Sequence, residues 1–118
     1  MRVIRVAKDK RRAESGPIFV GSVEIQRIVD VGERDLRLIE VHFKDGARNT
    51  WHTHTTDQIL VVTEGEGVVA SRAERREVTV GDVAYIPAGE EHWHGARPGT
   101  GMTHLAINGG SSKTTITE

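Results

Sequence analysis

The sequence predicts an all-β protein, a sandwich or jelly roll built from short antiparallel strands. Stretches of β-branched and apolar residues recur at short intervals and are separated by glycine-rich or charged turns. No segment has the sustained 3.6-residue apolar period of an amphipathic helix, and there are no internal repeats. With 118 residues the chain is expected to form one domain, residues 1–118.

The first part of the chain is an N-terminal arm, residues 1–17. Val3 and Val6 predict a short edge strand, and the charged run at residues 8–12 predicts a solvated loop.

Residues 18–29 are rich in β-branched side chains and predict a strand with a kink at Gly21, which residues 31–35 turn back.

The next strand, residues 36–43, has two possible registers. We expect Ile39, Val41 and Phe43 to face the interior, because the opposite register would bury the carboxylate of Glu40.

The second half of the chain continues the pattern. Strands are expected at residues 58–62, 68–71, 77–80, 83–86, 102–108 and, weakly, 114–117. Turns are expected at residues 64–67, 72–76 and 87–89, and residues 109–118 form a polar tail.

Composition narrows the choice of partners. Lys and Arg total 16 and Asp and Glu total 17, so no strong field favours nucleic acid or a membrane surface, and a small molecule is the expected partner. The chain has no cysteine, which excludes disulfides and thiolate metal sites. It has neither a signal-peptide stretch nor an apolar run of membrane-spanning length, which predicts a cytoplasmic protein.

Histidines gather in two short stretches that are built alike. His52 and His54 share one face of a strand by alternation, and His92 and His94 repeat the spacing in the second stretch. Gln58 follows the first pair at a distance that allows a bend. Imidazoles with one carboxamide oxygen suit a borderline divalent ion. A one-residue slip would present Asp57 instead of Gln58, and we favour Gln58 because Leu60 and Val62 then face inward with it.

The two stretches resemble the paired motifs of the cupin superfamily. The positions that fit the first motif, with glutamine in place of the usual glutamate, are Gly46, His52, His54, Gln58 and Gly65. The positions that fit the second are Gly81, Pro87, Gly89 and His92, while Ala96 stands where asparagine is usual. Residues around the motifs are similar to those of small bacterial cupins with hydroxynitrile lyase activity. Glu91 stands where those carry lysine.

The resemblance implies a single cupin jelly-roll β-barrel and an activity. The protein would cleave or form a cyanohydrin at one divalent ion, with manganese favoured and iron, nickel, copper or zinc possible. The implied metal ligands are His52, His54, Gln58 and His92. The implied bases are His94 and His104, which can take a proton near neutral pH.

The resemblance also implies the surroundings of this site. The expected walls of the substrate pocket are Ile39, Val41, Phe43, Leu60, Met102 and Asn108. Ile39 is bulkier than the residue implied there, which disfavours aromatic cyanohydrins. We expect a homodimer that pairs through residues 3–6.

Two other functions fit the same residues. A dioxygenase could bind an electron-rich diol or enolate at the metal, and a non-catalytic cupin could bind a small acid. Other residues have structural interpretations: we expect Trp51 and Trp93 to pack away from the ligands, Tyr85 to line a wall or interface, Thr53 and Thr55 to bond around the ligands, and His42 to lie on the surface.

Overall fold

The computed structural model describes residues 1–30, 32 and 35–118, and the turn expected at residues 31–35 lies largely outside this part. The described residues form almost only strands, with one 3-10 turn, η1 (Lys8–Lys10). The strands are β1 (Arg12–Glu14), β2 (Phe19–Val20), β3 (Val23–Val29), β4 (Leu36–Phe43), β5 (Arg48–Asn49), β6 (His52–His54), β7 (Gln58–Ser71), β8 (Arg75–Thr79), β9 (Val83–Ile86), β10 (His92–Ala96), β11 (Met102–Gly109) and β12 (Thr114–Ile116).

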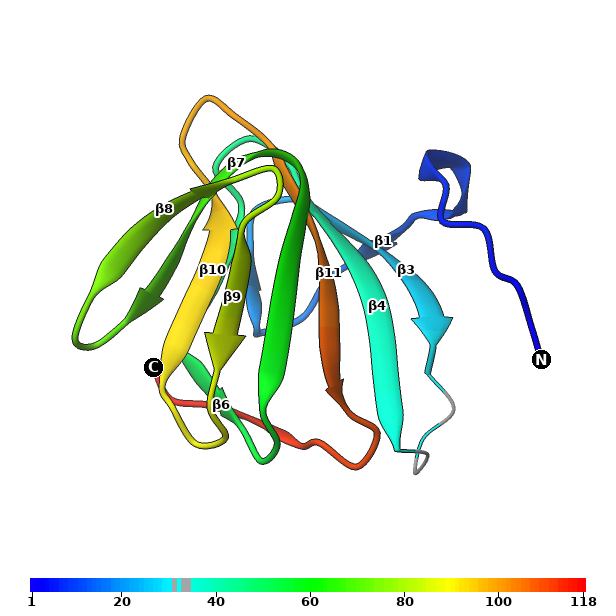
Figure 1. Cartoon of the computed structure of the whole chain (residues 1–118). Coiled ribbons are helices and arrows are strands. Elements are labelled where there is room, and N and C mark those ends of the chain that lie inside the picture. The colour runs from blue at the N-terminus through cyan, green and yellow to red at the C-terminus, as the bar shows by residue number, and fades with distance from the viewer. Residues whose placement is uncertain (31, 33–34) are drawn as a thin grey trace.

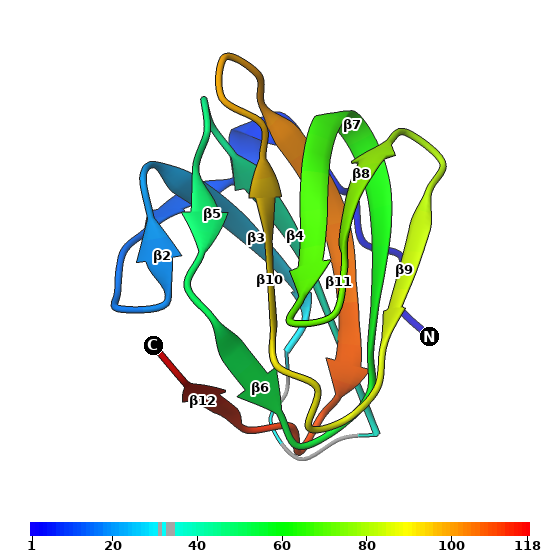
Figure 2. The same ribbon diagram turned by 90° about the vertical axis from the view of Figure 1, so that its left-hand side faces the viewer.

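The strands make two antiparallel sheets that face each other (Figure 1). The first sheet has the order β1, β3, β4, β11, β7, β9. The second contains β2, β5, β10, β7 and β8, and β6 with β12 extends it at the lower end of the view in Figure 2. The predicted all-β class is therefore confirmed, as a curled double sheet.

Strand β7 joins the two sheets by passing from one into the other. Its first half pairs with β11 and β9, and its second half pairs with β10 and β8. The expected turn at residues 64–67 is wrong, because the chain bends here without leaving the strand. Gly65 makes the bend possible, since its φ is 73° and a Cβ atom there would collide with the carbonyl oxygen of Gly101.

The space between the sheets is filled by apolar side chains. Val41 and Phe43 are buried in the main cluster, and Ile39 packs against it, so β4 has the expected inner face. A smaller cluster forms around Leu60, Ile86 and Ala106. Residues 18–29 form two strands, β2 and β3, because Gly21 breaks the expected single strand with a φ of 87°.

The N-terminal arm differs from the prediction. Residues 1–7 are in no strand of this chain, and Val3 is 94% exposed, so the expected edge strand at residues 3–6 is wrong for the single chain. The edge strand is β1, which begins within the charged run and pairs with β3. Gln26 fastens the arm, since its side chain accepts a hydrogen bond from Ala7 N (3.0 Å) and donates one to Arg5 O (2.8 Å).

Glu40 also differs from the prediction, because it is buried on the outer face of β4 at 6% exposure. The arm lies over it, and Arg11 donates from Nε to Glu40 (2.8 Å) and from Nη2 to Glu64 (2.6 Å). Burying a carboxylate alone is costly, which is why the sequence predicts Glu40 to be exposed, but an ion pair with a buried guanidinium offsets much of that cost.

Replacing Arg11 with alanine is expected to lower the free energy of unfolding by roughly 3–5 kcal/mol, because it leaves the Glu40 carboxylate buried without its partner. Urea unfolding measures this change. Arg12→Ala is the matched control, because Arg12 is exposed and its guanidinium donates to the backbone carbonyls of Asp9 and Arg11. Equal destabilisation by the two substitutions would contradict the interpretation.

The polar tail is ordered against the second sheet. Strand β12 pairs with β6, in agreement with the weak strand expected at residues 114–117. Among the described residues, no helix has the length and apolar character needed to span a bilayer.

Candidate metal centre

Two neighbouring strands bring three histidines together. β6 contributes His52 and His54, which alternation places on one side of a three-residue strand. β10 contributes His92, which is the direct cross-strand partner of His52. One potential ligand atom from each of these three side chains lies within 4.8 Å of the others. The expected convergence of these histidines is therefore observed.

Hydrogen bonds fix which nitrogen of two rings carries the proton. Nδ1 of His52 lies 2.7 Å from Thr50 O, and Nδ1 of His92 lies 2.8 Å from Glu90 O. A carbonyl oxygen can only accept, so both Nδ1 atoms are donors. In a neutral ring the lone pair is then on Nε2, which is the protonation state that a metal ligand needs.

His54 supplies the observation that best fits a metal ion. Its Nδ1 lies 2.9 Å from Thr114 Oγ1, while its Nε2 is buried without a hydrogen-bond partner in the described structure. A buried polar atom without a partner is costly unless something else binds it. A divalent cation held by the three rings would satisfy this nitrogen.

Gln58 lies beside the histidines as a fourth donor. Its Oε1 is 3.2 Å from His92 Nε2, and its Nε2 donates to Asn108 Oδ1 at 3.1 Å. Two acceptor atoms that face each other at this distance would be satisfied by a cation between them. Asp57 points the other way, since it is exposed and accepts from Tyr85 OH (2.6 Å) and Ala88 N (2.8 Å).

Replacing Gln58 with alanine is expected to weaken manganese binding at least tenfold, whereas Asp57→Ala should leave it unchanged, because only Gln58 lies at the cluster. Calorimetric titration of the two variants with Mn²⁺ measures the difference. The reverse ranking would transfer the ligand role to Asp57.

His94 and His104 lie deeper in the barrel, next to the three ligands. Their rings are joined by a 3.0 Å contact between His104 Nε2 and His94 Nδ1. The His94 ring centroid is 5.7 Å from those of His52 and His92. His94 Nε2 and His104 Nδ1 are both buried without a partner in the described structure. Five of the six histidines therefore form one continuous group.

The expected pocket walls all lie inside the barrel, and the apolar ones belong to the two core clusters. Val41, Phe43 and Met102 belong to the main cluster and Leu60 to the smaller one, with Ile39 packed against both. Phe43 reaches the histidines, with its ring centroid 5.4 Å from that of His104. Asn108 bonds to Gln58 as described above. These residues pack against one another as core.

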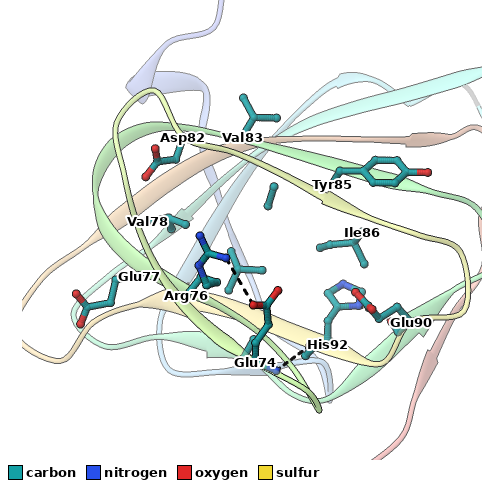
Figure 3. A pocket seen from close by; sticks show the side chains of 14 residues that line it. Glu74, Arg76, Glu77, Val78, Asp82, Val83, Tyr85, Ile86, Glu90 and His92 are labelled. Carbon is teal, nitrogen blue, oxygen red and sulfur yellow. Dashed lines mark hydrogen bonds and ion pairs between the residues drawn. The ribbon is translucent and has the colours of Figure 1, made fainter.

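A cavity of about 380 Å³ reaches the site from another direction, between β8 and β9. Figure 3 shows Ile86, Glu90 and His92 close together on one side of it, and Glu74 in an ion pair with Arg76. None of the expected walls lines this cavity. The sequence could not indicate this cavity, because much of its lining comes from β8 and β9, edge strands that lie in different sheets.

Several other residues lie differently from the expectations or were missed. Thr55 Oγ1 accepts from Lys113 N (2.9 Å) and so holds the tail, not a ligand. His42 is only half-buried, and its Nδ1 lies 2.8 Å from Thr103 Oγ1. Thr114 was missed, because only the folded tail brings it to His54.

Burial keeps the histidines neutral. Desolvation lowers the pKa of His52 and His104 to about 4 and that of His54 to about 3, and it lowers those of His92 and His94 as well. Neighbouring imidazoles add to this effect at His52, His54 and His94. The cluster is therefore uncharged near neutral pH and ready to bind a cation.

The metal-free protein is expected to lose stability between pH 6.5 and 5. In the unfolded chain these histidines bind protons near pH 6.5, whereas in the folded state the pKa of His52 and His104 is about 4 and those of the other three are also lowered. Their contribution to stability is therefore present at higher pH and lost as pH falls. A pKa lowered from 6.5 to about 4, as at His104, corresponds to roughly 3 kcal/mol. Urea unfolding at pH 8 and pH 5 tests this, and constant stability would argue against neutral buried rings.

A comparison with known families agrees with this geometry. Residues 39–110, which include all the histidines and Gln58, match the model of the cupin domain. The chain belongs to the cupin family. This cupin is 38% identical over 109 residues to an (R)-mandelonitrile lyase from Granulicella tundricola, covering 91% of this chain and 83% of the relative.

Solved structures give the same family and fold. A cupin-like protein from Thermotoga maritima has a TM-score of 0.83 and 33% identity, covering 89% of this cupin and 83% of that chain. A polyketide cyclase from Streptomyces resistomycificus has a TM-score of 0.83 at 20% identity, covering 99% and 87% of the two chains. The second similarity supports the fold alone.

Proposed function

We propose that this cupin is a divalent-metal-dependent lyase that cleaves or forms small cyanohydrins, with manganese as the favoured ion. The observation that carries the proposal is the buried group of His52, His54 and His92, whose free ring nitrogens converge beside the carboxamide oxygen of Gln58. The similarity to the (R)-mandelonitrile lyase indicates the class of reaction.

The ligand set favours a hydroxyl substrate. A divalent ion bound there supplies a Lewis acid for the hydroxyl oxygen of the substrate. Gln58 is neutral, where cupins usually carry glutamate, so the ligands leave the full double positive charge to attract an oxyanion. Asn108 holds the carboxamide in the orientation that keeps its oxygen toward the histidines.

His94 and His104 are the acceptors for the proton of the substrate hydroxyl. Their lowered pKa values keep both rings neutral, so one of them can accept the proton of the hydroxyl. The bond between the carbinol carbon and the nitrile carbon then breaks, its electron pair leaves with cyanide, and the carbinol becomes an aldehyde or a ketone. The accepted proton passes to the cyanide.

An anaerobic assay tests the function. Protein loaded with Mn²⁺ is expected to release benzaldehyde from mandelonitrile or acetone from acetone cyanohydrin, to stop when a chelator removes the metal, and to resume when Mn²⁺ returns. Release that continues without metal contradicts the proposal. Oxygen consumption with a diol and no cyanohydrin cleavage identifies a dioxygenase, and metal and ligand binding without turnover identifies a binding protein.

We also propose that the protein is a homodimer and that the first sheet forms its interface. Many outward side chains of β4, β11, β7 and β9 are apolar: Leu36, Leu38, Leu105, Ile107, Ile59, Val61, Val83 and Tyr85. Leu36, Val83 and Tyr85 are each more than 60% exposed in the single chain. Residues 6–11 of the arm lie beside this face, near Leu105 and Thr63, so a second copy would cover the arm and the face together.

Sedimentation analysis tests the dimer. Ile107→Lys places a charge in the middle of the face and is expected to give a monomer. Val20→Lys is the matched control, because Val20 is 46% exposed but belongs to the second sheet. A monomeric wild-type protein would contradict the proposal.

A further inference from the structure

The two facing ligands are oriented in the same way, by the carbonyl group two residues earlier in the chain. Thr50 O accepts from His52, and Glu90 O accepts from His92. The residue between carbonyl and ligand is Trp51 in one segment and Glu91 in the other. A contact that restrains the side chain of Trp51 or Glu91 therefore also restrains the neighbouring peptide, whose carbonyl orients His52 or His92.

One side chain contacts both of them. The guanidinium carbon of Arg72 lies 3.8 Å from the centroid of the Trp51 ring, which is a close cation–π contact. Arg72 also donates from Nε to Glu91 Oε1 at 2.7 Å and from Nη2 to Glu91 Oε2 at 3.2 Å. A planar guanidinium can make both contacts at once, because its face stacks while its edge forms a two-pronged bond to the carboxylate.

The backbone that carries Arg72 is itself held at the tip of the β7–β8 hairpin. Ser71, the preceding residue, pairs with His92 across the sheet. Its N donates to Glu74 O at 2.8 Å, and its Oγ accepts from Ala73 N and Glu74 N, both at 3.2 Å. Arg72 thus extends from a fixed turn toward both ligand-bearing segments.

We propose that Arg72 is a positioning residue of the metal centre, which holds the peptides before His52 and His92 in register through Trp51 and Glu91. The inference rests on the proposed metal site.

The sign of the effect separates this role from simple electrostatics. Removing a positive charge near a cation site should strengthen metal binding if charge alone matters. Removing the support of the ligand histidines should weaken it. Arg72→Lys is the most informative change, because it keeps the charge but loses the planar stacking and the two-pronged bond.

Titration of the metal-free protein with Mn²⁺ measures the effect. Arg72→Gln is expected to weaken binding about tenfold and Glu91→Gln by a similar factor, since loss of an outer partner of a metal ligand costs about 10- to 100-fold. Arg72→Lys should weaken binding less than Arg72→Gln. The double variant Arg72→Gln/Glu91→Gln should bind Mn²⁺ with about the affinity of the single variant that binds it less tightly. No further loss is expected, because both changes remove the same contact.

Arg76→Gln is the matched control. Arg76 lies on the same hairpin, is exposed, and contacts Glu74 at 3.5 Å, not Trp51 or Glu91. Arg76→Gln removes one positive charge, as Arg72→Gln does, and should leave Mn²⁺ binding unchanged or slightly tighter. The visible absorption spectrum of bound Co²⁺ should change in Arg72→Lys and remain that of the wild type in Arg76→Gln, because only the former alters the ligand geometry.

The outcomes distinguish the metal site itself from the positioning role of Arg72. A wild-type protein that binds neither Mn²⁺ nor Co²⁺ overturns the metal site, and the role of Arg72 with it. The role of Arg72 alone is overturned if the wild type binds both ions, Arg72→Lys and Arg72→Gln bind Mn²⁺ within a factor of about two of the wild-type affinity, and their Co²⁺ spectra are unchanged. Metal-free Arg72→Lys should melt at the wild-type temperature, since this side chain is 58% exposed; a loss of affinity that merely follows a loss of folding would also count against the role.

Discussion

Replacing His92 with alanine is expected to abolish both metal binding and cyanohydrin cleavage. His92 is fully buried and lies between His52 and Gln58, so its removal takes away one imidazole and leaves the carboxamide oxygen without a neighbouring ligand. Affinity for Mn²⁺ should fall by more than the roughly 100-fold that loss of an outer-shell partner costs. Calorimetric titration gives the affinity, and aldehyde release gives the activity.

His42→Ala is the control for this change. It also removes a histidine, but one on the outer face of β4 whose partner is Thr103, away from the ligands. It should bind Mn²⁺ like the wild type. If His92→Ala still bound the metal tightly, the ion would have to be held by other groups and the proposed centre would be wrong.

Replacing His104 with glutamine is expected to lower kcat by about 100-fold or more while leaving Mn²⁺ affinity near that of the wild type. A positioned proton acceptor contributes about 10²- to 10⁴-fold to such a reaction. His104 is completely buried and touches His94 and Phe43, not the three metal ligands. It can therefore influence the proton without holding the ion.

Parallel measurements on His94→Gln and His42→Gln complete this test. If both His94→Gln and His104→Gln lose activity, the two rings act together; if only one does, that ring is the base. His42→Gln should retain activity. Full activity in both buried variants would exclude the pair as the proton acceptor and would leave the lyase reaction without one.

The sequence determined the fold class and most of the candidate metal site for local reasons. Alternation in an extended strand requires His52 and His54 to share a face, whatever the strand packs against. The same rule put Gln58 on the side of Leu60 and Asp57 on the other, as the structure has them. Turn-forming glycines and the absence of a helical period were equally local signals.

The tertiary structure decided what depends on distant parts of the chain. Glu40 is buried because an arm almost thirty residues earlier covers it with Arg11, at a sequence separation of 29. β7 bends without a turn because Gly65 meets the backbone at Gly101. The cavity of about 380 Å³ opens between β8 and β9, where no run of residues marks it.

The sequence by itself therefore determined which side chains could bind a metal ion, because strand periodicity depends only on near neighbours. Only the tertiary structure decided the distant partners around them: Thr114 of the tail at His54, Asn108 of β11 at Gln58, and Arg72 of a hairpin at Trp51. These contacts join segments that are far apart along the chain, and their partners are fixed by how the two sheets pack.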